Sequence, residues 1–79
     1  MDKKKFIEHL IGLGFKTGDS YAHSKDDHYI ITNTIFFTYF YDSKFIIEIE
    51  YSDINGIYNF NKKFINIIRR NKLNKILLK

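Results

Sequence analysis

The chain has 79 residues, enough for one small domain, and it contains no cysteine, so disulfides and thiolate metal sites are excluded. Its formal net charge of +4 is unevenly divided: residues 59–79 carry seven of the thirteen basic residues and no acid, whereas residues 1–58 carry six lysines against nine acids. Because a segment charged with one sign attracts surfaces of the opposite sign, the C-terminal end predicts an anionic partner.

The apolar composition predicts a densely packed core and no membrane segment. Fourteen isoleucines and fourteen aromatic residues are present in the 79. No apolar run approaches the ~20 residues that a membrane-spanning helix requires. A signal peptide is not expected, since Glu8 and His9 interrupt the first apolar stretch. We therefore expect a cytoplasmic protein with no membrane partner.

The first predicted element is a short amphipathic helix over residues 3–13. Asp2 is a suitable N-cap, and the apolar residues that follow it recur at near-helical spacing. Gly14 followed by Phe15 is typical of a glycine just past a helix end, with a hydrophobic contact behind it. Residues 16–20 have the composition of a turn or loop.

Residues 21–58 are predicted to form an antiparallel sheet. Apolar and polar residues alternate over 44–51, which places Phe45 and Ile47 on one face together with the later apolar residues of the strand. Asp42-Ser43 predicts a turn that joins this strand to residues 34–41 as a hairpin. Residues 28–32 form a further predicted strand, and residues 21–24 an edge strand. A meander of three or four strands results.

A second helix is predicted over about 59–79, capped by Asn59 or Asn61, with Phe60, Phe64, Ile67 and Ile68 on its apolar stripe. Leucines and isoleucine continue an apolar side to its end: Leu73, Ile76, Leu77 and Leu78. The predicted fold is a single α+β domain over 1–79, of order α-β-β-β(-β)-α, in which two helices cover one face of the meander sheet.

The basic side of this second helix is the first candidate site. Its residues for an anionic partner or nucleic acid are Lys62, Lys63, Arg69, Arg70, Lys72 and Lys75. They are suited to phosphates of RNA or DNA or to an acidic protein surface, and a solvated helix face is the simplest alternative. Arg69 and Arg70 are the chain's only arginines, and Arg grips phosphate and carboxylate in a bidentate manner.

The other side of the sheet is the second candidate. Both faces of strand 34–41 are apolar, so Phe36, Phe40 and Ile46 are expected on the side that the helices leave open. An aromatic patch there predicts a protein interface, which includes a homodimer, or a platform for base stacking. The alternative is that a loop or residues 73–78 cover it.

No catalytic constellation is recognisable, and we expect no enzyme, no cofactor and no metal. His23, Asp26, Asp27 and His28 cluster in the sequence, but the pattern is that of a polar hairpin turn. There is no cysteine nucleophile, no glycine-rich phosphate loop and no serine elbow motif.

Three resemblances follow from these residues. The element order, with Asn61-Lys62-Lys63 near the start of the last helix, resembles the double-stranded-RNA-binding fold, which implies phosphate contacts by the two lysines. The Gly14-Phe15 step after the first helix is similar to that of HicA-type toxins, which implies a ribonuclease using His23, although no glycine precedes it in Asp-Ser-Tyr-Ala-His. Chains rich in Ile, Lys, Asn, Phe and Tyr, which make up 46 of the 79 residues here, resemble accessory proteins of phages, including anti-CRISPR proteins.

The resulting hypothesis is a small non-enzymatic interaction protein, encoded by a phage or mobile element. It would bind and modulate or inhibit a host protein or ribonucleoprotein that has an acidic or phosphate-rich surface. The alternatives are a nucleic-acid-binding module and a HicA-like ribonuclease.

Overall fold

The computed structural model describes residues 2–18 and 21–77, and the side chains of residues 2–18 and 21–72. Its elements in chain order are α1 (Lys3–Gly12), β1 (Lys16–Thr17), β2 (Ala22–Lys25), β3 (His28–Thr32), β4 (Phe36–Tyr41), β5 (Lys44–Glu50) and α2 (Gly56–Leu77). Among the described residues, neither helix has the length and apolar character needed to cross a bilayer.

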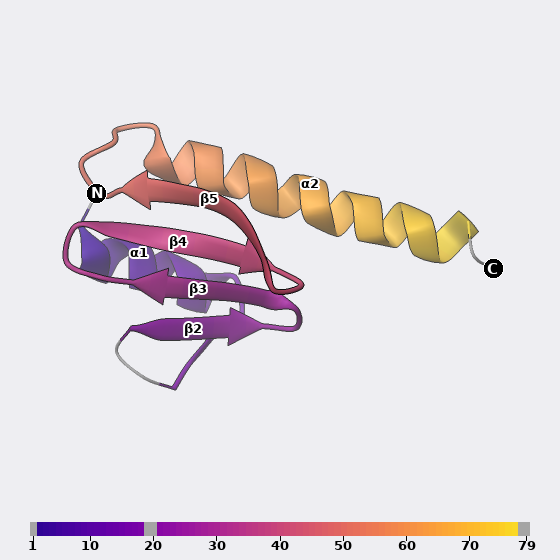
Figure 1. The fold of residues 1–79 in the computed structure, drawn as a ribbon, viewed down its shortest axis with the longest axis horizontal. Helices are drawn as coiled ribbons and strands as arrows, with labels where there is room; N and C mark the ends of the chain where they lie inside the picture. Colours follow the sequence, from indigo (N-terminus) through magenta and orange to yellow (C-terminus); the bar gives the residue numbers. More distant parts are fainter. Residues whose placement is uncertain (1, 19–20, 78–79) are drawn as a thin grey trace.

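The five strands form one antiparallel meander in the order β1-β2-β3-β4-β5. In Figure 1, α1 lies behind the strands and α2 runs along the β5 side of the sheet, so the opposite face of the sheet is turned toward the viewer. The predicted α+β fold with two helices on one face is confirmed. The prediction missed β1, because two exposed residues leave no burial pattern in the sequence.

Aromatic side chains hold both helices on the same face. Phe6 of α1 stacks on Phe37 of β4, with ring centroids 3.8 Å apart, and Phe60 of α2 meets the two rings edge-on at 5.5 and 5.7 Å. All three are fully buried. His9 Nε2 donates a hydrogen bond to Asn61 Oδ1 over 2.8 Å and joins the helices directly. One aromatic cluster therefore forms the shared core of α1, α2 and the sheet.

Both ends of α1 follow the sequence prediction. Asp2 Oδ1 accepts a hydrogen bond from the Lys5 backbone N–H, so Asp2 is the N-cap. At the other end, the N–H groups of Gly14 and Phe15 donate to the carbonyls of Ile11 and Leu10, which is the Schellman pattern. Gly14 has φ +95, a conformation that glycine adopts at little cost. The Lys25 ammonium donates to the Leu13 carbonyl over 2.6 Å and places a cation at the helix C-terminus.

A β-bulge in β5 reverses two predicted side-chain directions. Tyr39 pairs with Ile47 whereas Phe40 pairs with Phe45, so Ile46 is an extra residue without a partner on β4. Ile46 and Ile47 therefore both pack against the core, and Phe45 turns outward and is 61% exposed. The prediction that Phe45 faces the core and Ile46 the open side is wrong for both, because strict alternation fails at a bulge.

The second helix begins earlier than predicted, at Gly56 rather than after Asn59 or Asn61. The Asp53 side chain accepts a hydrogen bond from the Asn55 N–H over 2.9 Å, and the Asp53 carbonyl accepts one from Gly56. This turn starts the helix without an asparagine cap at 59 or 61. Further along, Asn71 Nδ2 donates to the Tyr41 hydroxyl at the end of β4. Beyond this contact α2 continues past the end of the sheet (Figure 1).

Candidate interaction surfaces

The outward side of α2 forms a surface that we call the basic helix surface. It consists of five exposed cationic residues, Lys62, Lys63, Arg69, Arg70 and Lys72. It exists because Phe60, Phe64 and Ile67 recur at intervals of four and three and turn one stripe toward the core, which leaves the intervening positions in water. The prediction that Ile68 belongs to this stripe is wrong, since its side chain is 39% exposed. The predicted Lys75, and the apolar residues predicted at Leu73 and 76–78, have side chains outside the described part of the chain.

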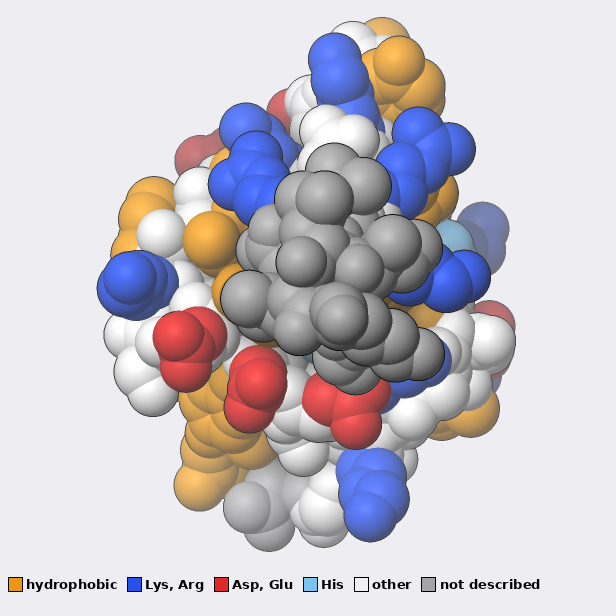
Figure 2. Space-filling view, turned by 90° about the vertical axis from the view of Figure 1, so that its right-hand side faces the viewer, with side chains coloured by type: hydrophobic (Ala, Val, Ile, Leu, Met, Phe, Trp, Pro, Cys, Tyr) orange, Lys and Arg blue, Asp and Glu red, His pale blue; other side chains and the backbone are white. Residues whose placement is uncertain are grey.

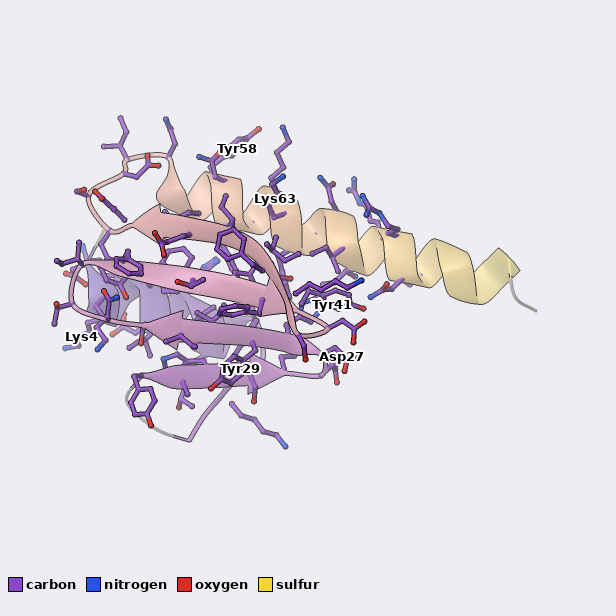
Figure 3. The ribbon with its side chains drawn as sticks, in the orientation of Figure 1. Lys4, Asp27, Tyr29, Tyr41, Tyr58 and Lys63 are labelled. Carbon is purple, nitrogen blue, oxygen red and sulfur yellow. The ribbon has the colours of Figure 1, made fainter. Side chains whose placement is uncertain are left out.

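Cations on this surface lie in two rows. Lys62 and Arg69 are seven residues apart, as are Lys63 and Arg70, so each pair spans about 10 Å along the helix. The whole of α2 contains no acidic residue. Lys63 points away from the sheet in Figure 3, and Lys and Arg side chains gather around the end of α2 in Figure 2. Lys62 and Lys63 lie in the second turn of α2, not at its first residues, because the helix starts at Gly56.

The face of the sheet opposite the helices carries a row of three rings, which we call the aromatic row: Tyr29, Phe40 and Phe45. Tyr29 contacts Phe40 with ring centroids 6.4 Å apart, and Phe40 contacts Phe45 edge-on at 6.3 Å. These residues come from β3, β4 and β5 and are cross-strand partners. Of the predicted interface residues, Phe40 belongs to this row, Phe36 lies on the same face and Ile46 does not.

Exposed carboxylates surround the aromatic row, and we call them the acidic rim: Asp26, Asp27, Asp42, Glu48 and Glu50. The first three belong to the β2–β3 and β4–β5 turns, which lie together because the Asp42 N–H donates to the Asp27 carbonyl over 3.0 Å. Figure 2 shows acidic side chains along this end of the sheet, below the end of α2. The rim opposes phosphate, which argues against base stacking on this face.

A shallow hollow of about 500 Å³ lies where the aromatic row meets the turns. It is lined by Asp26, Asp27, Tyr29, Ile31, Phe40, Asp42 and Ser43. In Figure 3, Asp27 lies at the turn end of the sheet and Tyr29 lies over β3. The floor is therefore apolar and the border is anionic.

Both histidines of the sequence cluster are buried in the helix-covered face. His23 is 2% exposed and its Nε2 lies 3.3 Å from the Thr32 hydroxyl, while His28 Nδ1 shares a 2.6 Å hydrogen bond with the Tyr39 hydroxyl. Burial lowers the pKa of His23, and the nearby charge of Lys3 adds to this. Burial also lowers the pKa of His28, although Asp26 and Asp27 act against it. Burial raises the pKa of Tyr39.

This burial bears on the resemblance to HicA-type ribonucleases. A catalytic imidazole must reach a scissile phosphate, and the side chain of His23 faces the core instead. The alternation of β2 and β3 explains the placement, since His23 pairs with the buried Ile30. Across residues 2–18 and 21–72, no group of three His, Asp or Glu side chains is arranged to hold a metal ion. The structure therefore lends no support to a His23-based reaction.

Sequence reasoning missed Tyr29, Phe45 and the three turn aspartates as parts of one surface. Tyr29 and Ile31 carry a readable signal, because they share one face of residues 28–32 and Ile30 lies on the other, so one apolar set must face outward. Phe45 carries none, since its direction depends on the bulge.

Comparison of the chain with protein-family models, with curated proteins and with solved structures finds no match.

Proposed function

We propose that this protein is a small non-enzymatic interaction protein of a phage or mobile element, which acts in the cytoplasm. It binds an anionic surface on a host protein or ribonucleoprotein and thereby modulates or inhibits that partner. The observation that carries the proposal is the basic helix surface: five exposed cations on one helix that contains no acid. Its position supports the same view, because these cations lie on the side of α2 turned away from Phe60 and Phe64, which pack into the core.

Arg69 and Arg70 are the expected anchors of this contact. Both are exposed, and they follow Phe64, the last strongly buried residue among the described side chains of α2, by more than one helical turn. A planar guanidinium binds a carboxylate or phosphate through two parallel hydrogen bonds, which gives direction as well as attraction. Lys62, Lys63 and Lys72 add charge that speeds the encounter.

A nucleic-acid-binding module is the second candidate. The two rows of cations on α2 favour it, because successive positive charges about 10 Å apart can follow a phosphate backbone. In that case binding is to RNA or DNA directly and is largely independent of base sequence.

Affinity capture from host lysate, with and without nuclease treatment, separates these possibilities. The variant for comparison is Arg69→Gln/Arg70→Gln/Lys72→Gln. A matched control, Lys4→Gln/Lys5→Gln/Lys16→Gln, removes the same charge from exposed residues of α1 and β1. We expect a stoichiometric protein partner that survives nuclease and whose capture falls about tenfold or more in the α2 variant but not in the control.

Two results decide against the primary proposal. If capture is lost on nuclease treatment and purified RNA or DNA binds with a strong salt dependence, the nucleic-acid module is correct. If both triple variants lose binding equally, net charge alone matters and the basic helix surface is not the site.

A further inference from the structure

We propose that the outer sheet face is a second docking site, which binds a cationic segment of another protein in which Lys or Arg side chains are interspersed with apolar ones. This goes beyond the basic helix surface, does not depend on it, and requires a partner of the opposite charge. The site comprises the aromatic row, the acidic rim and the hollow between them.

The first argument is charge. Five of the nine acidic residues of the chain lie around this one face, and every one of them is exposed. The cations of α2 lie on the other layer of the molecule (Figure 3). An anionic rim repels nucleic acid and anionic lipid surfaces and attracts Lys and Arg, so the charge selects a basic partner.

The second argument is the apolar centre. Phe45 is 61% exposed, Tyr29 41% and Ile31 38%, and they adjoin the half-buried Phe40. Large apolar side chains gathered on one exposed face of a sheet are typical of the centre of an interface. The bulge at Ile46 is what brings Phe45 into the row, since regular alternation would turn that ring inward.

The third argument is the match to Arg in particular. A guanidinium can lie on an aromatic ring while its N–H groups reach a carboxylate, and this face offers both kinds of group side by side. Tyr29, Phe40, Asp27 and Asp42 line the same hollow. The two aspartates are held together by the hydrogen bond from the Asp42 N–H to the Asp27 carbonyl, so little ordering is needed on binding.

The test is a titration of ¹⁵N-labelled full-length protein with synthetic peptides, followed by amide chemical shifts. The probe is four repeats of Arg-Leu-Ser. Two matched peptides separate the contribution of charge from that of the apolar side chains. Glu-Leu-Ser repeats reverse the charge, and Arg-Gly-Ser repeats remove the apolar side chains. We expect saturable shifts in β3, β4 and the Asp42–Ser43 turn with the first probe, binding about tenfold weaker with Arg-Gly-Ser, and none with Glu-Leu-Ser.

Matched variants locate the contact. Asp26→Asn/Asp27→Asn/Asp42→Asn removes rim charge but keeps the turns, because Asn tolerates the positive φ of Asp26 and Asp42. Its control, Asp2→Asn/Glu8→Gln/Asp53→Asn, removes equal charge elsewhere and preserves the Asp2 and Asp53 hydrogen-bond acceptors. Phe45→Ser is compared with Ile54→Ser, a residue 95% exposed and away from the face. We expect about a tenfold loss for the rim variant, about fivefold for Phe45→Ser, and less than about twofold for either control.

Several results would overturn the proposal. These are shifts that map to α1 or α2 instead of the outer face, equal losses in the rim variant and its control, and no saturable binding at all. A concentration-dependent dimer that buries Phe45 without peptide would also overturn it, since the occupant would then be a second copy. Arg69→Gln/Arg70→Gln/Lys72→Gln should leave peptide binding unchanged, so the failure of either proposal is recognisable separately.

Discussion

At the scale of single residues, the β4–β5 turn combines a functional surface with a conformational cost. Asp42 and Ser43 both have positive φ, +51 and +63, as the type I′ turn of a two-residue hairpin requires. Asp tolerates this region moderately well, whereas Ser is ill suited to it. The cross-strand pairs next to the turn, Tyr41 with Lys44 and Phe40 with Phe45, hold it in this form. The turn in this form places Asp42 at the hollow.

Ser43→Gly should therefore stabilise the protein. Glycine adopts φ +63 without a Cβ clash, so we expect the free energy of unfolding to rise by about 1 kcal/mol in urea denaturation. Ser52→Gly is the control, since Ser52 has no positive φ, and this change adds unfolded-state entropy and removes the 3.4 Å hydrogen bond from the Ser52 hydroxyl to Glu50, so it should not stabilise the protein. An unchanged or lower free energy of unfolding for Ser43→Gly would contradict the backbone strain inferred at Ser43.

At the scale of elements, α2 serves two purposes on opposite sides. One side supplies Phe60 and Phe64 to the core, and these rings stack on each other with centroids 5.8 Å apart. The other side carries the basic helix surface. Because the same helix is held by the core and displays the cations, binding residues can change there without loss of the fold, which makes the proposed variants interpretable.

Two alanine substitutions on α2 test this division. Phe60→Ala removes a ring that is 0% exposed and contacts Phe6, Phe37 and Tyr39, so we expect a loss of about 3–5 kcal/mol. Tyr58→Ala, two residues away, removes a side chain that is 67% exposed, and a change within about 0.5 kcal/mol is expected. Thermal or urea unfolding measures both; similar losses for the two variants would contradict the orientation of α2.

At the scale of the whole molecule, charge and burial are both segregated by layer. The cations of α2 and the carboxylates of the acidic rim lie on different layers, with an aromatic core between them that also encloses His23 and His28. In a domain of 79 residues that core must supply nearly all the stability, so ionisation inside it has a global effect.

We accordingly predict that stability falls as the pH drops below about 6.5. The folded state lowers the pKa of His23 and His28 below their ordinary value of 6.5, so below that pH the unfolded chain binds protons that the native state does not. The stability that the two neutral histidines contribute is fully present above pH 6.5. It is lost as the pH falls toward their pKa values in the folded state. Urea midpoints at about pH 7 and about pH 5 should show the decrease, and imidazole NMR titrations that place both midpoints above 6.5 would contradict it.

The sequence by itself determined the helix over residues 3–13, the hairpin around Asp42-Ser43, the strand 28–32, the α+β class and the segregation of charge. These depend on local patterns: a cap at Asp2, Gly14 past a helix end, alternation in strands, and a stripe formed by Phe60, Phe64 and Ile67. Sequence patterns also predicted the two candidate surfaces in outline, with Phe36 and Phe40 on the open face.

Only the tertiary structure decided the composition of that face. Because of the bulge at Ile46, Phe45 faces the open side of the sheet and Ile46 packs against the core, the reverse of the prediction. The hydrogen bond between the two turns brings Asp27 beside Asp42. Local patterns cannot show either feature, because each depends on which residues of one strand face those of the next. Cross-strand register is set by the fit of the whole core, and a shift of one residue moves a side chain from one face of the sheet to the other.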